Sequence, residues 1–325
     1  MPAPRPVPAP LRLGPFTAAE ADALGVTDSQ RRGQRYRTLS RGVHEVVRSG
    51  AGTAEESAAR IAVLAAARPV LALTPGAALS HASAGVVWSL RLPRRLQGAR
   101  PLHVTRVDDG VPPRRRGVAG HHAELAPWET AGVEGVVVTA PVRTLLDLAP
   151  VLSPDELVAC VDGVVCEHRH GLRSGVPALV PRAELMRQLG RYSRRRGVRR
   201  LRLAAERSVP GVDSAPETRL RLLLREHGIE EVAADHRIVA PDGTEVLPDL
   251  AVESARLSIQ YEGAHHDRAG QREVDIRRQR RTEAAGWSEV RITHRDLVED
   301  LVKPFGTGPR AVALVRAAIR TGWLR

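Results

Sequence analysis

Cysteine, lysine, asparagine and aromatic residues are scarce or absent in this chain of 325 residues. Its two cysteines, Cys160 and Cys166, cannot form the disulfide framework of a small secreted domain. No window holds about 18 uninterrupted apolar residues, so the sequence predicts no transmembrane helix and no membrane partner. Residues 1–10 alternate proline with small residues and lack the apolar segment of a secretory signal. We therefore expect a cytoplasmic protein.

The rest of the composition is that of an ordinary folded protein with a strongly basic charge. Hydrophobic residues make up 42% of the chain and charged residues 26%, and the length predicts two or three domains. Lysine occurs once, at Lys303, so nearly all basic residues are arginines. A codon bias that replaces lysine by arginine leaves the charge unchanged, and it does not account for the formal net charge of +12. This charge indicates a polyanionic partner, most often nucleic acid.

The N-terminal part of the chain has the pattern of a small DNA-binding module. Residues 1–13 are expected to be a disordered, proline-rich lead, and residues 14–50 a winged helix-turn-helix. Thr17 and Glu20, and then Thr27 and Gln30, have the spacing of helix caps, with Gly25 at the turn between the two helices. Residues 36–46 alternate around a Ser-Arg-Gly turn, as a hairpin does. The alternative is a small helical cap with a hairpin. On the first interpretation, double-stranded DNA is contacted by five arginines: Arg31, Arg32, Arg35, Arg37 and Arg41.

Residues 51–180 predict a mixed α/β domain. The expected helices cover residues 54–67 and 77–90 and begin again at Pro141 and at Ser153, and the expected strands cover 102–107, 118–125 and 135–139. Three ordered segments, 79–85, 103–105 and 138–149, resemble the AbiEi antitoxin family of bacteria. In that family a winged helix-turn-helix precedes an α/β domain, and members repress their own operons. The resemblance implies repression and makes a cognate toxin a candidate partner.

Residues 181–210 are expected to form an arginine-rich helical linker. Six arginines lie close together there: Arg191, Arg194, Arg195, Arg196, Arg199 and Arg200. Such a run is typical of a solvated linker, and it is equally the composition of a patch that follows DNA phosphates. The sequence leaves both interpretations open.

Residues 211–325 predict a helix, three strands, a helix, a strand and a final helix. Ser214 is the expected cap of a helix that ends near His227, and a Pro-Asp-Gly turn separates strands over 237–240 and 245–252. A third strand is expected over 256–262 and a fourth over 289–293. Between these two strands, residues 272–285 are expected to form an amphipathic helix. The fold class predicted for the whole chain is therefore α/β and multidomain.

The motifs in this last region occur in a recognisable order over residues 214–301. The pair Pro248-Asp249 is followed by residues 259–263, by His265-His266 and then by Gly286-Trp287. This run is similar to the very-short-patch-repair (Vsr-like) endonuclease domains of the PD-(D/E)xK fold, which occur in many actinobacterial proteins. The resemblance implies a restriction-endonuclease-like αβββαβ core and a hydrolase that cuts DNA phosphodiesters with a metal ion.

The residues themselves are compatible with that chemistry. Because strand side chains alternate, Gln260 and Glu262 share a polar face, and Asp249 lies on the neighbouring strand. Oxygen ligands at a sheet edge suit Mg²⁺ or Mn²⁺, which would lower the pKa of a bound water. We expect Asp249, Glu262 and Glu217 to hold the metal and Gln260 to complete the shell. Glu217 resembles the helix carboxylate that some such nucleases add, and His266 would relay a proton or hold phosphate.

Two positions depart from the nuclease motif. Gln260 stands where the motif has an acid, and Glu262 stands where it has lysine. Losing one carboxylate weakens metal binding. Two hypotheses follow: a Mg²⁺-dependent DNA endonuclease recruited by its winged helix, or an antitoxin-like transcriptional repressor whose nuclease-fold domain is catalytically degenerate. Both predict DNA binding that weakens with salt.

Three other groups of residues have ordinary structural explanations. Asp275 and Arg278 are spaced for an ion pair on one helix face. Cys160 and Cys166 lie six residues apart, which predicts buried thiols rather than a metal cluster. Strand alternation sends His121 and His122 to opposite faces, so the two are not expected to share a site.

Overall fold

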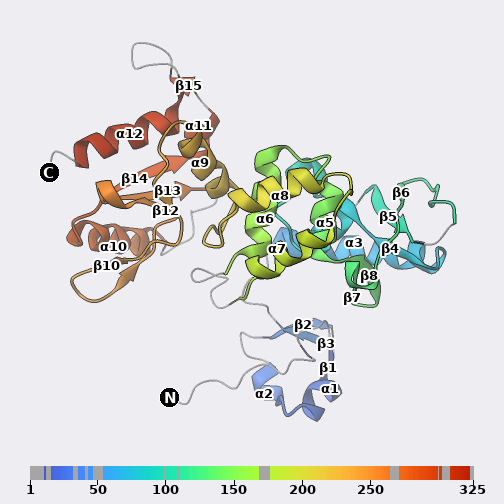
Figure 1. Cartoon of the computed structure of the whole chain (residues 1–325). Coiled ribbons are helices and arrows are strands. Elements are labelled where there is room, and N and C mark those ends of the chain that lie inside the picture. Colours follow the sequence, from blue (N-terminus) through green and yellow to red (C-terminus); the bar gives the residue numbers. More distant parts are fainter. Residues whose placement is uncertain are drawn as a thin grey trace. The chain divides into compact units, whose positions relative to one another are not determined.

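The computed structural model describes residues 11, 16–31, 36–40, 43–46, 54–98, 100–107, 110–167, 176–263, 271–298, 300–301 and 308–322. The chain divides into two units (Figure 1). The first consists of residues 1–152 and 167–203, and the second of residues 153–166 and 204–325. Both units combine helices with sheets, which confirms the predicted α/β multidomain class. Within the described ranges, no helix is both long enough and apolar enough to cross a bilayer.

The N-terminal segment of the first unit has two short helices followed by a hairpin. Its elements are β1 (Phe16–Thr17), α1 (Ala18–Ala23), α2 (Asp28–Arg31), β2 (Tyr36–Ser40) and β3 (Val43–Val46). The three strands are antiparallel, in the order β1-β3-β2. The predicted cap of α2 is confirmed, because the Thr27 amide donates to Gln30 Oε1 at 2.9 Å and the Gln30 amide to Thr27 Oγ1 at 3.3 Å. Gly25 has a φ of +75°, as its place in the predicted turn requires.

The rest of the first unit is built on a five-stranded mixed sheet. Its elements are α3 (Ala54–Ala72), β4 (Ala77–Leu79), α4 (His81–Val87), β5 (Leu102–Arg106), β6 (Val118–His122), β7 (Thr130–Val133), β8 (Val136–Thr139), α5 (Pro141–Leu148) and α7 (Arg182–Arg191). The strand order is β6-β5-β4-β8-β7, with β4 parallel to β8 and β5 parallel to β6. A further helix, α8 (Val198–Arg207), follows α7, so residues 181–210 are largely helical, as expected.

The predicted helix over residues 77–90 is wrong at its start. Residues 77–79 form the strand β4, and α4 begins only at His81. Ala77, Ala78 and Leu79 are all buried, since β4 pairs with β5 on one side and β8 on the other. A strand buried in this way is a continuous apolar run, which periodicity does not separate from a buried helix.

Helix α6 (Pro154–Val165) belongs to the second unit, whereas the expected boundary placed it in a domain ending at residue 180. The predicted cap is confirmed, because Ser153 Oγ accepts from the Glu156 amide and Glu156 Oε2 accepts from the Ser153 amide. Asp162 of this helix forms a fully buried ion pair of 2.9 Å with Arg221. This pair joins α6 to the first helix of the C-terminal region.

The second unit contains a four-stranded sheet with a separate hairpin. Its further elements are α9 (Ala215–Glu226), β9 (Val232–Ala233), β10 (Ile238–Val239), β11 (Glu245–Val246), β12 (Leu250–Val252), β13 (Leu257–Glu262), α10 (Gln271–Ala284), β14 (Ser288–Thr293), α11 (His294–Val298), β15 (Asp300–Leu301), β16 (Gly308–Pro309) and α12 (Arg310–Gly322). The sheet order is β14-β13-β12-β9, and only β13 and β14 are parallel within it.

The strands before β13 differ from the prediction. The sheet opens with β9, and the two strands around the Pro-Asp-Gly turn, β10 and β11, pair only with each other. The expected strand over 245–252 is divided into β11 and β12. Pro248 lies at the division, and because proline has no amide hydrogen it interrupts a ladder of hydrogen bonds.

The two faces of this sheet are chemically different. Side chains of its apolar face pack against α9 and α12 in a buried core: Leu220, Leu224, Leu250, Leu257, Ile259, Ile292, Val312 and Val315. The predicted alternation along β13 is confirmed, since Leu257 and Ile259 enter this core while Ser258 and Gln260 face the other side. Helix α10 lies on that other, polar side (Figure 1). It is not the amphipathic helix expected. It faces polar side chains, and nearly all of its own residues are charged or polar.

Candidate functional site

The polar face of the β12–β13–β14 sheet carries three of the five residues predicted for the nuclease site: Asp249, Gln260 and Glu262. Gln260 on β13 pairs in register with Arg291 on β14, and Leu250 pairs with Ile259. Extending the second register by one residue places Asp249 opposite Gln260. Paired residues on neighbouring strands have side chains on the same face. Asp249, Gln260 and Arg291 therefore form a row across three strands.

Arg291 donates hydrogen bonds to three side chains on this face. Its guanidinium donates to Glu262 Oε1 at 2.8 Å, to Glu289 Oε1 at 3.0 Å and to Gln279 Oε1 of α10 at 3.2 Å. Burial opposes the charge of Arg291, but the bonds to Glu262 and Glu289 outweigh it and raise its pKa. The arginine is therefore a permanent cation between two carboxylates.

Asp249 occupies the end of the row next to β12. Its Oδ2 accepts a hydrogen bond of 2.7 Å from the backbone amide of Tyr261. Burial raises the pKa of the Asp249 carboxyl, and the charges of Asp213 and Glu289 raise it further, against the opposing effects of that hydrogen bond and of Arg278. The surroundings therefore disfavour the charged form of the Asp249 carboxyl group.

Glu217 and Gln260 are engaged in local structure. Glu217 is buried, and its two carboxylate oxygens accept from Ser214 Oγ at 2.6 Å and from the Asp213 amide at 2.9 Å. These bonds, with Ser214 as the predicted N-cap, close the start of α9. Gln260 is 2% exposed and its amide lies 3.5 Å from Ser258 Oγ. His266 lies outside the described residues.

A magnesium site is not assembled by the described carboxylates. Asp249, Glu217 and Glu262 do not bring one ligand atom each to within 4.8 Å of one another. Among the described residues, one group of three histidines in the first unit meets this criterion. Glu262 and Glu289 each have one oxygen bonded to the Arg291 guanidinium. Glu289 does retain one buried oxygen that has no hydrogen-bond partner among the described residues. As they stand, these side chains do not fit Mg²⁺ or Mn²⁺.

The N-terminal arginines are only partly described. Arg31 is 5% exposed and donates to the Val26 carbonyl at 2.7 Å, with a further bond to the Asp22 carboxylate. This burial corrects the expectation that Arg31 contacts DNA, because its charge is already used to join α1 to α2. Arg37 lies on β2 opposite Glu45. Arg32, Arg35 and Arg41 lie outside the described residues.

Exposed arginines do gather after α7 in the first unit. Arg194, Arg195 and Arg196 are exposed in the loop that joins α7 to α8. Arg191 stacks over Trp128, with its guanidinium carbon 5.1 Å from the ring centre. Arg200, in contrast, donates to the carbonyls of Leu152 and Pro150 and so has a structural role. The three loop arginines and the exposed Arg199 of α8 are suited to contact phosphates.

Two features of the structure were not predicted. The first is the role of Arg291, whose residue type is plain in the sequence but whose neighbours come from two other elements. The second is the group formed by His81, His103 and His121 in the first unit. No local spacing links these histidines, so only the sheet brings them together. By contrast, the ion pair of Asp275 with Arg278, at 3.7 Å, and the burial of the Cys160 and Cys166 thiols are confirmed.

The polar face and the distribution of arginine carry the functional assignment. Comparison with protein-family models, with curated proteins and with solved structures found no match to this chain.

Proposed function

We propose that this protein binds double-stranded DNA as a repressor of the antitoxin type, and that its second unit does not hydrolyse DNA. One observation supports the proposal that the second unit does not hydrolyse DNA. The Arg291 guanidinium bonds Glu262 and Glu289 on the face where a nuclease would hold its metal ion. A cation of the protein itself thus offsets part of the negative charge of this face.

The bonds around Arg291 make displacement by a metal ion unfavourable. Hydrogen bonds between a guanidinium and a carboxylate are about twice as strong as those between neutral groups. A divalent ion placed beside Glu262 and Glu289 would have to break two of them and would also repel the arginine. Gln260 offers only a neutral oxygen in place of the motif acid, so little is gained in return.

Charge and topology support the DNA-binding half. The formal net charge is +12, and Arg194, Arg195 and Arg196 are exposed together. In the N-terminal segment, two helices lie between β1 and β2, and the strand order β1-β3-β2 is the one a winged helix-turn-helix would have. Arg37, on β2, would then belong to the wing, which lies along the DNA backbone.

A cognate toxin is the further partner that a repressor of this type would have. Binding of that toxin would be expected to change the affinity for the operator, as in any pair of linked sites. A neighbouring gene for a nucleotidyltransferase-like toxin would support this assignment. A neighbouring gene for a methyltransferase or a helicase would favour a nuclease instead.

A metal-dependent endonuclease is the second candidate, and one specific observation favours it. Glu289 keeps a buried oxygen without a hydrogen-bond partner in the described part of the chain, and its charge acts on Asp249, whose pKa is raised by burial. Such a pair of carboxyl groups could take up an ion if Arg291 moved away. The strand order of the second unit is also compatible with an αβββαβ core.

The experiment that separates the candidates combines binding with cleavage. Untagged full-length protein is incubated with supercoiled plasmid and with mismatched duplexes in Mg²⁺ or Mn²⁺, beside EDTA, while a fluorescent duplex reports affinity. We expect salt-sensitive binding without nicking. Metal-dependent nicking that disappears in Asp249→Ala would establish the endonuclease. A folded protein that binds no duplex at low salt would overturn both candidates.

A further inference from the structure

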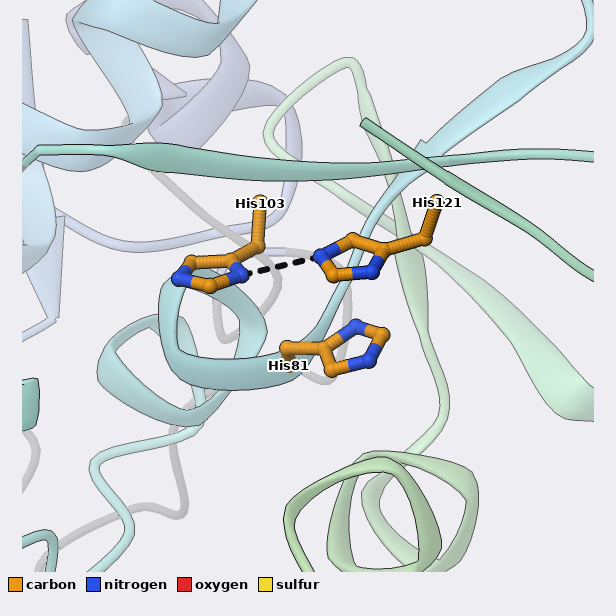
Figure 2. Close-up of side chains that lie close together, drawn as sticks. All are labelled: His81, His103 and His121. Carbon is orange, nitrogen blue, oxygen red and sulfur yellow. Dashed lines mark hydrogen bonds between the residues drawn. The ribbon is translucent and has the colours of Figure 1, made fainter. Parts of the chain in front are cut away.

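Three histidines from separate segments of the first unit converge at one edge of its sheet (Figure 2). His81 is the first residue of α4, His103 lies on β5 and His121 lies on β6. In the parallel β5–β6 pair, Thr105 is the partner of His121, so the two side chains lie on the same face. His103 is two residues from Thr105 on β5 and therefore also lies on this face. His81 meets the other two histidines from the start of α4.

The imidazole nitrogens are already close to one another. His103 Nδ1 lies 3.0 Å from His121 Nε2, and the ring centres of His81 and His121 are 3.7 Å apart. One nitrogen from each of the three rings lies within 4.8 Å of the other two. In a tetrahedral zinc site with Zn–N distances of about 2.0–2.1 Å, ligand nitrogens lie about 3.3 Å apart. Nitrogens up to 4.8 Å apart must therefore move closer together for an ion to bind.

Neighbouring hydroxyl groups hold two of the histidines in place. Ser80 Oγ lies 3.0 Å from His81 Nδ1 and itself accepts a 2.8 Å hydrogen bond from Thr105 Oγ1. The backbone amide of His103 donates to Ser83 Oγ at 3.0 Å. A partner on one ring nitrogen fixes the orientation of the ring and leaves the other nitrogen available to a metal.

The backbone of His81 is also unusual. Its φ is +48°, in the left-handed region that costs energy for a residue other than glycine. Conformations of this kind persist where the surrounding structure enforces them, and they occur preferentially at ligand sites. Here the conformation brings the ring over those of His103 and His121.

Burial disfavours the protonated form of all three rings. It lowers the pKa of His81 to about 3 and that of His103 to about 4, and it also lowers the pKa of His121. Because the rings are close together, a proton on one of them would further disfavour a proton on its neighbours.

We propose that His81, His103 and His121 bind a Zn²⁺ ion, with water as the fourth ligand. Three imidazoles select zinc and related transition metals, whereas Mg²⁺ prefers oxygen ligands. The site lies in the first unit and is independent of whether the protein binds or cuts DNA.

Binding has two structural consequences. The rings of His81 and His121 are nearly parallel, with an angle of 16° between them, so their lone pairs do not meet at one point. At least one of these rings must turn when the ion binds. Because β6 is an edge strand of the sheet, the ion would also fasten that edge to β5 and α4. Zinc should therefore stabilise the folded first unit by mass action.

The test uses untagged full-length protein from which metal has been removed with a chelator. Zn²⁺ binding is measured by calorimetry, and Co²⁺ serves as a spectroscopic probe because tetrahedral Co²⁺ absorbs strongly in the visible range. We expect one tight ion per chain, and a loss of affinity of at least about tenfold in His103→Gln and in His121→Gln. The matched control is His122→Gln, the exposed neighbour on the opposite face of β6, which should bind as the wild type does.

The proposal also predicts structural readouts that do not depend on activity. Zn²⁺ should raise the melting temperature of the wild type and of His122→Gln but not of His121→Gln. Circular dichroism establishes that each variant is folded, and His81→Asn, which suits a positive φ, provides a third variant if a glutamine variant unfolds. Unchanged Zn²⁺ affinity in His103→Gln and His121→Gln would overturn the proposal. So would binding that disappears only when the histidines at 168, 170, 265 and 266 are replaced.

Discussion

Two buried acidic residues of the second unit differ in the hydrogen bonds that they accept. Asp162 is fully buried and accepts bonds from Arg221, Thr218 and the Val209 amide. Asp249 accepts a bond from the Tyr261 amide and lies near two other carboxylates. Burial raises the pKa of both carboxyl groups, but Asp162 has a cation bonded to it, which is the arrangement of a structural ion pair.

Replacing Arg221 by methionine should destabilise the second unit by about 3–5 kcal/mol, because it leaves the Asp162 carboxylate buried without its cation. Arg219→Met, an exposed position on the same helix, is the control and should change stability little. Urea-dependent hydrogen exchange of peptides from α9 and β13 measures the effect within the full chain. Equal stability of the two variants would contradict the structural role of the pair.

Replacing Asp249 by asparagine should stabilise the second unit at pH 7, because it removes a buried charge yet keeps an oxygen for the Tyr261 amide. The pKa of Asp249 is raised above the value of 3.8 that applies to the unfolded chain. The native state therefore takes up a proton at a higher pH than the unfolded state does. Stability of the wild type relative to Asp249→Asn should rise as the pH falls from 7 toward 4.

Hydrogen exchange of β13 peptides at several pH values measures this difference. The other titrating groups are common to both proteins, so the comparison isolates Asp249. A variant less stable than the wild type at pH 7 would mean that hydrogen bonds and Arg278 hold the charged form, and the prediction would fail.

At the scale of elements, the β13–β14 pair has one apolar face and one polar face, and α10 lies on the polar face. Helix α10 contributes Gln279 to Arg291 and carries few apolar residues. Polar contacts of this kind give less stability than an apolar core, since hydrogen bonds within the protein replace bonds to water. Arg291 lies at the centre of this layer and bonds residues of three elements, including Gln279 of α10.

Replacing Arg291 by alanine should leave Glu262 and Glu289 without their cation. Because the Glu289 side chain is only 2% exposed, we expect a loss of about 1–3 kcal/mol in the free energy of unfolding. Mn²⁺ should restore part of this loss by binding the released carboxylates, while the wild type gains nothing. Hydrogen exchange of β14 peptides with and without Mn²⁺ measures both effects within the second unit. The control is Arg237→Ala, which breaks an exposed ion pair with Glu245. Equal stabilisation of the wild type by Mn²⁺ would show that Arg291 does not exclude metal.

Features with local causes could be predicted from the sequence. Ser153, Ser214 and Thr27 were identified as helix caps because a cap and its partner lie three residues apart. The strand over 257–262 was identified because alternation is also local. The strand β4 was missed, since Ala-Ala-Leu suits a buried helix and a buried strand alike, and only the neighbours β5 and β8 decide between them.

Features that depend on distant partners could not be predicted. Arg31 has the residue type of a DNA contact, but Asp22 and the Val26 carbonyl surround it in the structure. The polar row on β13 was anticipated from Gln260 and Glu262, whereas the bond of Glu262 to Arg291 required the register with β14. The histidine group is the extreme case, since 22 and 18 residues separate its members.

At the scale of the whole molecule, the chain carries much of its positive charge on exposed arginines, so the total alone does not locate a binding surface. Loop arginines of the first unit, Arg194, Arg195 and Arg196, are exposed consecutively. Arginines of the second unit such as Arg237 and Arg277 are exposed as well, but they pair with Glu245 and Glu273. Exposed charge is therefore of two kinds, and the salt dependence of DNA binding distinguishes them.

Replacing Arg194, Arg195 and Arg196 together by alanine should reduce the salt dependence of DNA binding. Each phosphate contact contributes about 0.9 to the slope of log K against log salt, so the slope should become shallower by up to about 2.7. A matched variant replaces Arg237, Arg277 and Arg280, which lowers the formal net charge equally but at exposed positions of the second unit. That variant should keep the wild-type slope if the loop contacts the phosphates. Fluorescence anisotropy of a labelled duplex over a salt series measures both. Equal slopes for the two variants would mean that net charge, and not the loop after α7, attracts the DNA.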